Sequence, residues 1–275
     1  MELTKKVLDR IARMCLLDDG FMKKVFEDKA CAELLLRIIL DKPDLMVETV
    51  QTELLLKNLQ GRDVRLDVYA SDAQGKQYNI EVQRKNYGAT PKRARYNSSL
   101  LDANITNPGD DYKQLPESYM IFITEHDVFR QDKQLYHFER ICPEINMFLN
   151  DGSHIIYVNA SKHTDTALGR LMQDFGCVRA SDMYFDILAD RVRYFKENQE
   201  GMKTMCRIWE EFVEDGRAEG RAQGIAQGRA EGRAEGEANM AKETAKRMLE
   251  DGEPVEKIIR YTNLTLEQID ELRSK

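Results

Sequence analysis

The sequence predicts an α/β fold whose elements follow the order helix, three strands, helix, strand, with a helical extension behind them. Apolar and polar residues alternate over residues 64–70 and 77–83, which predicts a β-hairpin. A Thr-Pro pair at 90–91 predicts that a helix starts soon after the hairpin. Segments rich in β-branched and aromatic residues at 118–124 and 154–159 predict two further strands.

The segment before the hairpin predicts a helix and a first strand. Residues 24–40 carry an apolar stripe at helical spacing, and Pro43 follows as a stop signal. Residues 44–56 alternate in polarity and predict the first strand of a three-stranded meander. After the hairpin, the helix that begins at Pro91 is expected to run to about residue 105.

The turn of the hairpin fixes which residues face each other. Gly75 can take the left-handed conformation that closes a three-residue loop over a bulge. The three apolar residues Val64, Leu66 and Val68 then share one face. The register pairs Ser71 with Gln77, Tyr69 with Asn79, Asp67 with Glu81 and Arg65 with Gln83. Opposed side chains have Cβ atoms roughly 5 Å apart, so the polar face carries an acidic pair.

This acidic pair requires an explanation, because like charges on opposed strand residues destabilise a sheet. Asp67 or Glu81 could bind a proton, or both could hold a hard divalent cation such as Mg²⁺, which takes oxygen ligands. The alternative is a solvated polar face in which Arg65 neutralises the acids and nothing binds. The residues alone leave both interpretations open.

A basic segment follows the hairpin. Residues 84–96 read RKNYGATPKRARY and hold five cations, no anion and two tyrosines. Such a segment beside an acidic pair favours a polyanionic substrate, since phosphate contacts supply most non-specific affinity for DNA. The alternative is an ordinary solvated helix start with Tyr96 packed on the sheet. The candidate substrate-binding residues are Arg65, Arg84, Lys85, Lys92, Arg93, Arg95 and Tyr96.

Several blocks of sequence occur in an order that is typical of a known group. They are RLDV at 65–68, YNIEVQ at 78–83, RARY at 93–96, LLD at 100–102 and YMIFI at 119–123. Over roughly residues 20–200 the chain resembles the PD-(D/E)XK nuclease superfamily, and more narrowly the recombination-promoting nuclease family of transposase-like bacterial proteins. The resemblance implies a restriction-endonuclease-like core, in which helices flank a mixed central sheet. It also implies a DNA endonuclease that uses Mg²⁺, with Mn²⁺ as a substitute.

The resemblance also assigns roles within the hairpin. Asp67 corresponds to the metal-binding Asp and Glu81 to the acidic residue of the (D/E)-X-K element, with the Val82 carbonyl as an expected third ligand. Leu66 stands in place of the Pro of the family name. The family often has a further acidic residue near its first core helix; Glu33 is one candidate, with Glu48 and Glu53 as rivals.

Gln83 occupies the position usually held by the catalytic Lys of the superfamily. Its amide carries no charge but can hydrogen-bond a water or a phosphate oxygen. Gln is the usual residue in the recombination-promoting group, so the site resembles its nearest relatives. The missing positive charge is expected to come from Arg65, Arg84 or Lys85.

The length and composition agree with one sizeable domain plus appendages. The chain has 275 residues, of which 42% are hydrophobic, and a net charge of −7 that leaves room for a local basic groove. We expect a nuclease-like domain over residues 1–205, a linker or long helix over 206–240, and a small helix-turn-helix-like tail over 241–275.

No segment predicts a membrane span or a secretory signal. Five scattered cysteines without a Cys-x-x-Cys pair indicate reduced thiols and a cytoplasmic location. The four histidines show no zinc-ligand spacing, and we interpret each of them as structural.

The second organised feature is a glycine repeat. Its members recur every four residues at Gly216, Gly220, Gly224, Gly228, Gly232 and Gly236. Each glycine costs a helix about 1 kcal/mol relative to alanine. The repeat is therefore a long exposed helix, a closely packed seam between two helices, or a flexible linker. A phosphate-binding loop is not expected, because no strand precedes the repeat and no Gly-Lys-Ser/Thr closes it.

The tail predicts short helices at residues 243–250, 254–261 and 266–273, with a capping box from Thr265 to Gln268. The last helix carries Glu267, Asp270 and Glu271, which disfavours a DNA-reading face. We therefore expect a region for protein contact or homo-oligomerisation.

Two functions remain open. The first is a Mg²⁺-dependent DNA endonuclease, and the second is a catalytically weak DNA-binding or protein-interaction scaffold that retains the nuclease fold.

Overall fold

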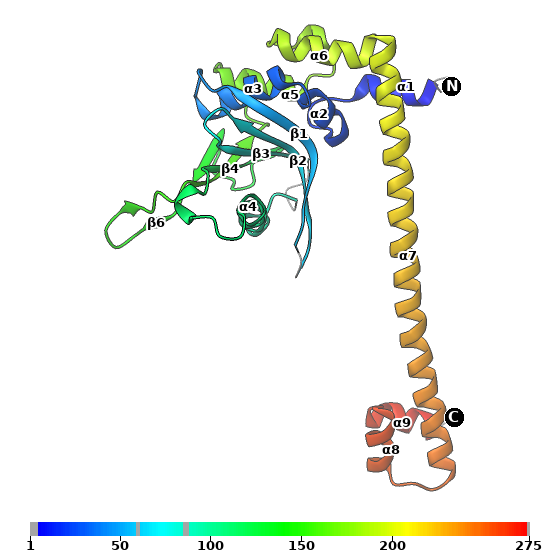
Figure 1. Cartoon of the computed structure of the whole chain (residues 1–275). Helices are drawn as coiled ribbons and strands as arrows, with labels where there is room; N and C mark the ends of the chain where they lie inside the picture. Colours follow the sequence, from blue (N-terminus) through cyan, green and yellow to red (C-terminus); the bar gives the residue numbers. More distant parts are fainter. Residues whose placement is uncertain (1–4, 59–60, 85–87, 274–275) are drawn as a thin grey trace. The chain divides into compact units, whose positions relative to one another are not determined.

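The structure, a computed structural model, describes residues 5–58, 61–84 and 88–273. The chain divides into two compact units, Met1–Glu210 and Glu211–Lys275, which are described separately (Figure 1). The first unit is built on a six-stranded sheet in the order β1-β2-β3-β4-β8-β5.

The sheet is mixed. β1, β2 and β3 form an antiparallel meander, β4 and β8 continue it in parallel, and β5 is antiparallel to β8 at the edge. A separate two-stranded ribbon pairs β6 with β7. The strands are β1 (Val47–Leu56), β2 (Val64–Asp72), β3 (Gln77–Gln83), β4 (Ser118–Thr124), β5 (Leu135–Phe138), β6 (Ile141–Cys142), β7 (Met147–Phe148) and β8 (Ser153–Asn159).

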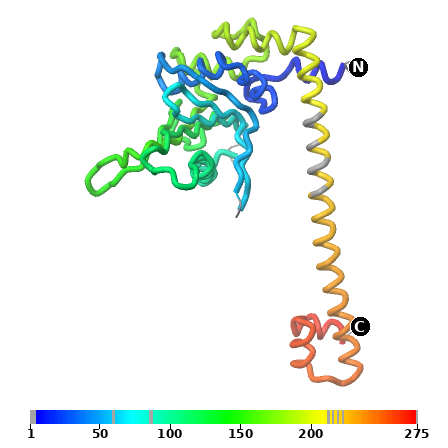
Figure 2. The backbone as a smooth tube through the Cα atoms, viewed as in Figure 1, coloured from blue at the N-terminus to red at the C-terminus, as the bar shows by residue number. Residues whose placement is uncertain are grey.

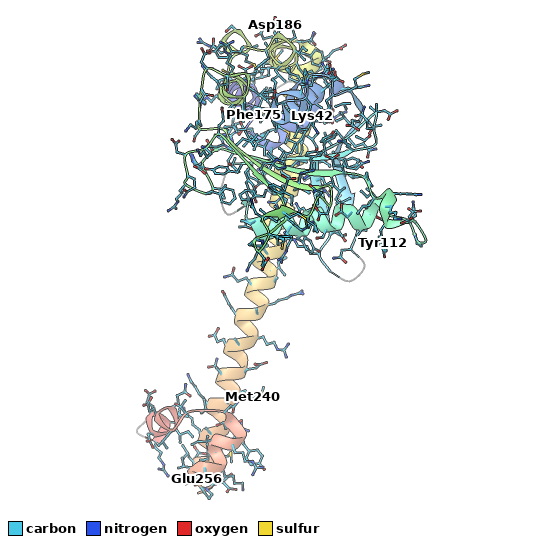
Figure 3. All side chains as sticks on the ribbon, turned by 90° about the vertical axis from the view of Figure 1, so that its left-hand side faces the viewer. Lys42, Tyr112, Phe175, Asp186, Met240 and Glu256 are labelled. Atoms are coloured by element: carbon cyan, nitrogen blue, oxygen red, sulfur yellow. The ribbon has the colours of Figure 1, made fainter. Side chains whose placement is uncertain are left out.

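Helices cover both faces of the sheet, which confirms the predicted α/β class (Figure 1). The larger core lies under α2, α3, α5 and α6, where Phe175 (labelled in Figure 3) stacks on Phe26 at 5.8 Å. α4 packs on the opposite face. The helices of this unit are α1 (Lys5–Arg13), α2 (Asp19–Phe26), α3 (Lys29–Leu40), α4 (Pro91–Ile105), α5 (Ala167–Gly176) and α6 (Asp186–Glu197).

The single helix predicted over residues 24–40 is wrong, because two helices, α2 and α3, meet there. The Asp28 carboxylate accepts hydrogen bonds from the backbone N–H groups of Ala30 (3.0 Å) and Cys31 (3.2 Å). This capping by an Asp starts a new helix although the apolar spacing continues across the break. The α4 prediction is confirmed at its start, where the Thr90 hydroxyl accepts from the Arg93 N–H.

The hairpin turn has the predicted geometry. Gly75 has a φ of +79°, and its N–H donates to the Asp72 carbonyl at 2.9 Å. The β2–β3 ladder contains the predicted pairs of Ser71 with Gln77 and Tyr69 with Asn79, and ends with Val68 opposite Ile80.

The predicted pairs of Asp67 with Glu81 and Arg65 with Gln83 continue this register but lie beyond the last pair of the ladder, so they stay predictions. On the other side of β2, the residue facing Asp67 is Glu53, which has a left-handed φ of +57°.

Leu66 and Val64 lie away from the face predicted for them. They pack against Leu100 and Leu101 of α4, whereas Val68 belongs to the larger core on the other side of the sheet. The prediction that the three apolar residues of β2 share one face is therefore wrong.

The β6–β7 hairpin projects from the first unit (Figure 2). Five of its large apolar side chains are exposed. These side chains are between 45% and 65% exposed, and they are Ile141, Ile145, Met147, Phe148 and Leu149. We call this set the apolar tip.

The second unit contains most of α7 (Gln199–Glu250), followed by α8 (Val255–Thr262) and α9 (Leu266–Arg273). Ala245 of α7 packs with Ile258 and Ile269 of the two short helices. The capping box forms, with reciprocal bonds between Thr265 and Gln268 at 2.9 and 3.3 Å. The predicted boundaries after residues 205 and 240 fall inside α7, and the division into three segments stays a prediction. Across the described residues, none of the helices has the length and apolarity that crossing a membrane requires.

The glycine repeat lies on α7, where the described side chains of residues 223–240 are exposed (Figure 3). A Cβ atom added at Gly224, Gly228 or Gly232 would meet no atom within 4 Å. Replacing these three glycines by alanine is therefore expected to stabilise the helix by up to about 1 kcal/mol at each position. Far-UV circular dichroism during thermal unfolding measures the gain.

The reverse substitution, Ala230→Gly, is the matched control and should lower helicity. The alternative is that the α7 helices of two copies pack closely along the glycine repeat. In that case the added methyl groups of the alanines would push the two helices apart. Sedimentation equilibrium would then show weaker self-association in the triple variant, and its helicity would not rise.

Candidate functional site

Asp67 and Glu81 are both buried, although both carry carboxylates. Glu81 is 0% exposed and Asp67 is 8% exposed. α4 covers this part of the sheet, because Ala89 and Ala94 pack against Met120 and Phe122 of β4. The polar face of the hairpin is thus an enclosed site, and the alternative of a solvated face is wrong.

Glu81 is held by a cation from α4. The Arg93 guanidinium donates from Nη2 to Glu81 Oε2 at 2.8 Å and from Nη1 to the Gly88 carbonyl at 2.7 Å. The Asn79 amide donates to Glu81 Oε1 at 3.2 Å. Burial raises the pKa of Glu81 above its usual value, although Arg93 and Asn79 act in the opposite direction.

Asp67 contacts a lysine of α2. Lys23 Nζ lies 3.3 Å from Asp67 Oδ1, and it also contacts Asp19 at 3.0 Å and Glu53 at 3.4 Å. Burial disfavours the charged form of Lys23, but the three surrounding carboxylates raise the pKa of Lys23 to about 12. Lys23 is therefore a fixed positive charge beside Asp67.

The second oxygen of Asp67, Oδ2, is buried and accepts no hydrogen bond from the described residues. Burial, together with the charges of Glu81 and Asp19, raises the pKa of Asp67 to about 8, and Lys23 only partly offsets this. A buried carboxylate oxygen without a donor is costly unless it binds a proton or a cation.

These features fit a hard divalent cation. Mg²⁺ is often bound by one or two protein carboxylates, with waters and substrate phosphate completing its shell. No third acidic or histidine side chain joins Asp67 and Glu81 in the described part of the chain. Val82 lies next to Glu81 in β3 with its side chain in the larger core, and ligation by its carbonyl stays a prediction.

Gln83 lies against the backbone that leads into α4. A Cβ atom at Gly88 would lie 2.0 Å from Gln83 Oε1 and 3.6 Å from an Arg93 guanidinium nitrogen. The Gln83 side chain therefore occupies the space that a side chain at position 88 would take. Arg93 is the described cation that adjoins both Gln83 and Glu81.

The cations predicted to compensate for the absent lysine are placed differently. Arg84 binds Asp18 at 2.8 Å and Glu125 at 3.2 Å, so two carboxylates already engage it. Arg65 is exposed on β2. Lys85 lies outside the described residues.

The remaining substrate-binding candidates lie on α4. Lys92 and Arg95 are exposed on its first turns. Tyr96 is 37% exposed, and its hydroxyl donates to the Arg62 carbonyl and accepts from the Asn58 amide at 2.8 Å.

The three additional acidic candidates fall into different places. Glu33 accepts from the Val47 N–H at 2.9 Å and binds Arg37, so it joins α3 to β1 and lies outside the site. Glu48 is exposed. Glu53 reaches Asp67 through the shared contact with Lys23, which makes it the candidate nearest to the site.

Sequence reasoning missed Asp19 and Lys23, and it placed Arg93 only among the substrate contacts. Asp19 and Lys23 are four residues apart on α2, which is the spacing of an ordinary ion pair along a helix. Their approach to Asp67 depends on how α2 packs on the sheet, and no local pattern encodes that.

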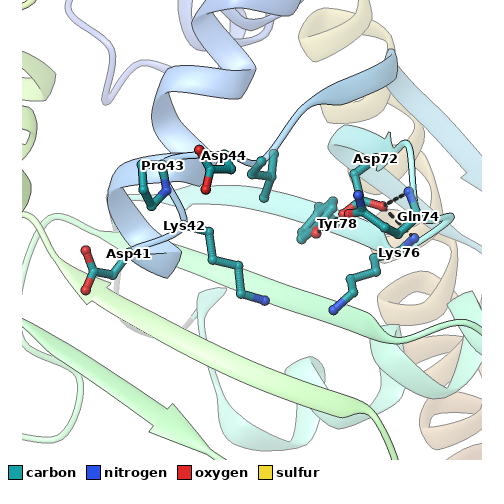
Figure 4. A pocket seen from close by; sticks show the side chains of 9 residues that line it. Asp41, Lys42, Pro43, Asp44, Asp72, Gln74, Lys76 and Tyr78 are labelled. Atoms are coloured by element: carbon teal, nitrogen blue, oxygen red, sulfur yellow. Dashed lines mark hydrogen bonds between the residues drawn. The ribbon is translucent and has the colours of Figure 1, made fainter.

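A pocket of about 410 Å³ opens at the turn end of the hairpin, and it is lined by Lys42, Lys76 and Tyr78 among others (Figure 4). In Figure 4 the ammonium groups of Lys42 and Lys76 point toward one another. Neither Asp67 nor Glu81 lines it. This pocket is therefore separate from the acidic pair.

A family model for PD-(D/E)XK nuclease family transposases matches residues 18–171, more than half of the chain. The matched segment contains Lys23, Asp67, Glu81 and Arg93. No curated protein matches the chain. No solved structure matches it.

Proposed function

Because the chain belongs to the PD-(D/E)XK nuclease family of transposases, we propose that Asp67 and Glu81 bind the divalent cation of a DNA endonuclease. The family supports a nuclease-type function, and the proposal adds the Mg²⁺ dependence, the DNA substrate and the residues. The observation that carries it is the buried, unpartnered Oδ2 of Asp67 beside the buried Glu81.

A bound Mg²⁺ would lower the pKa of a water molecule and shield negative charge during phosphodiester hydrolysis. Lys23 keeps Asp67 oriented by holding Oδ1, which leaves Oδ2 for the ion. Asn79 supports Glu81 in the same way. Each carboxylate is thus positioned before the ion arrives.

Arg93 and Gln83 serve the substrate side of the site. The Arg93 side chain is 38% exposed, so it can exchange Glu81 for a phosphate once the cation neutralises Glu81. Gln83 donates a hydrogen bond to a water or a phosphate oxygen from the adjoining position. Lys92 and Arg95, exposed on α4, extend this positive surface along the DNA backbone.

Cleavage of duplex DNA by the full chain tests the proposal. We expect nicking or cutting with Mg²⁺ or Mn²⁺ and none with a chelator. Glu81→Gln removes the charge without changing the shape of the side chain, and it should lower the rate at least about a hundredfold because the cation is lost. Glu48→Gln makes the same change at an exposed position and should leave the rate unchanged.

Equal cleavage by the wild type and Glu81→Gln would instead identify a contaminating nuclease and contradict the proposal. The second candidate, a scaffold with weak catalysis, is favoured by the uncharged Gln83. Its signature would be metal binding that Glu81→Gln removes, together with DNA binding but no cleavage. A cytoplasmic location and homo-oligomerisation through the C-terminal helices stay predictions.

A further inference from the structure

The edge of the sheet brings together side chains that are distant in sequence. β5 is antiparallel to β8, with His137 opposite Ile156 and Phe138 opposite Ile155. The same register sets Glu139 opposite His154. Since alternate residues of a strand share a face, His137 and Glu139 lie on the same side as His154.

The donor atoms of these three side chains converge. His137 Nε2 lies 3.0 Å from His154 Nδ1, and Glu139 Oε1 lies 3.6 Å from the same nitrogen. All three ligand atoms lie within 4.8 Å of one another. In a tetrahedral zinc site with bonds of about 2.0–2.1 Å, neighbouring ligand atoms are roughly 3.3 Å apart. We propose that His137, Glu139 and His154 bind one Zn²⁺ ion.

The surrounding residues favour the tautomer of His154 that a metal needs. Its Nε2 lies 3.2 Å from Glu117 Oε1. Glu117 also forms an ion pair with the Lys76 ammonium and accepts a hydrogen bond from the Tyr119 hydroxyl, an arrangement that favours the ionised carboxylate. An ionised carboxylate only accepts, so His154 carries its proton on Nε2 and presents the Nδ1 lone pair to His137 and Glu139.

His154 is also held in place before any ion binds. Its ring stacks on Tyr119 with centroids 4.5 Å apart, and its side chain is 14% exposed. The arrangement of carboxylate, histidine and metal ligand is one that orients zinc sites in general.

The ligand types distinguish this site from the one at Asp67. Two imidazoles and one carboxylate suit Zn²⁺, whereas an all-oxygen pair suits Mg²⁺. A bound ion would tie the four-residue edge strand β5 to β8, directly before the apolar tip. Three protein ligands leave one position for a water molecule.

Zinc binding by the full-length, chelator-stripped protein tests the inference. A competition titration of Zn²⁺ against a chromophoric chelator should give one tight site per chain. His137→Ala and Glu139→Gln change exposed residues, so the fold is retained, and each should weaken that site at least tenfold. Zn²⁺ should also raise the thermal unfolding temperature of the wild type but not that of His137→Ala.

His126→Ala is the matched control, since it removes an exposed histidine from outside the cluster. Cys142→Ser controls for binding by a nearby thiol, and Asp67→Asn separates this site from the proposed Mg²⁺ site. All three should retain the tight zinc site. Its absence from the wild type, or its survival in His137→Ala, would overturn the inference.

Discussion

Replacing Asp67 by asparagine is expected to abolish metal-dependent cleavage and, at the same time, to stabilise the metal-free protein. The carboxylate is buried beside Glu81, and Oδ2 has no donor among the described residues. An amide of the same shape removes the buried charge. It also removes a ligand of the ion, so the loss of activity should be at least about a hundredfold.

The pH dependence of stability follows from the raised pKa of Asp67. The pKa of Asp67 is about 8 in the folded chain against an ordinary value of 3.8, so between these values the folded state binds more protons than the unfolded state. The wild type should therefore lose stability as the pH rises from about 4 to about 8, by at most about 1.4 kcal/mol per unit. Lys23 keeps Asp19 and Glu53 as partners in the variant.

Urea unfolding of the metal-free protein measures this effect. At pH 8 Asp67→Asn should be more stable than the wild type by about 2–4 kcal/mol, and the difference should shrink toward pH 4. Mg²⁺ must displace the proton of Asp67, so its affinity for the wild type should rise up to about tenfold per pH unit below pH 8. A difference in stability that does not vary with pH would show that Asp67 is ionised in the folded chain.

The second large effect is expected from Arg93→Met, which removes the cation from Glu81. Glu81 would then be a fully buried charge that keeps the Asn79 amide as a hydrogen-bond donor but no longer has a guanidinium beside it. We expect Arg93→Met to lower the free energy of unfolding by about 2–3 kcal/mol at pH 8. This loss is small for a broken buried ion pair, because the Arg93 side chain is partly exposed. The loss of unfolding free energy should become smaller as the pH is lowered, since the pKa of Glu81 is raised by burial and protonation removes its charge.

Urea unfolding and metal titration measure the outcome together. Mg²⁺ should bind Arg93→Met more tightly than the wild type, because the ion no longer competes with the guanidinium, while cleavage falls. When Glu81 is already replaced by Gln, adding Arg93→Met should change the free energy of unfolding very little, because no buried charge is left without a partner. Arg95→Met changes an exposed residue of the same helix and should stay within about 0.5 kcal/mol of the wild type. A cost as large in Arg95→Met would assign the effect to α4 itself.

The elements that the sequence predicts correctly are those fixed by local chemistry. Gly75 closes the turn, Thr90 and Pro91 start α4, and Thr265 with Gln268 caps the last helix. Each of these depends on residues no more than a few positions apart. The break between α2 and α3 was missed because the apolar spacing continues across Asp28, and only the capping bonds reveal it.

The sequence predicted the acidic residues of the site, but it did not predict which cations contact them. Alternation predicted Asp67 and Glu81 as an opposed pair, and both side chains are buried. Lys23 reaches the site through the packing of a separate helix, and Glu53 through a backbone conformation that its residue type does not suggest. Proximity in sequence pointed to Arg65 and Arg84, whereas the contact with Glu81 comes from Arg93.

The apolar tip is expected to promote non-specific self-association in solution. Five large apolar side chains on a projecting hairpin form a surface through which two molecules can adhere without any specific fit. The predicted association through the C-terminal helices would be a second source of self-association at high concentration, beside this hairpin. Adhesion through the tip strengthens with added sulfate, as apolar contacts do, whereas ion pairs between helices weaken in salt.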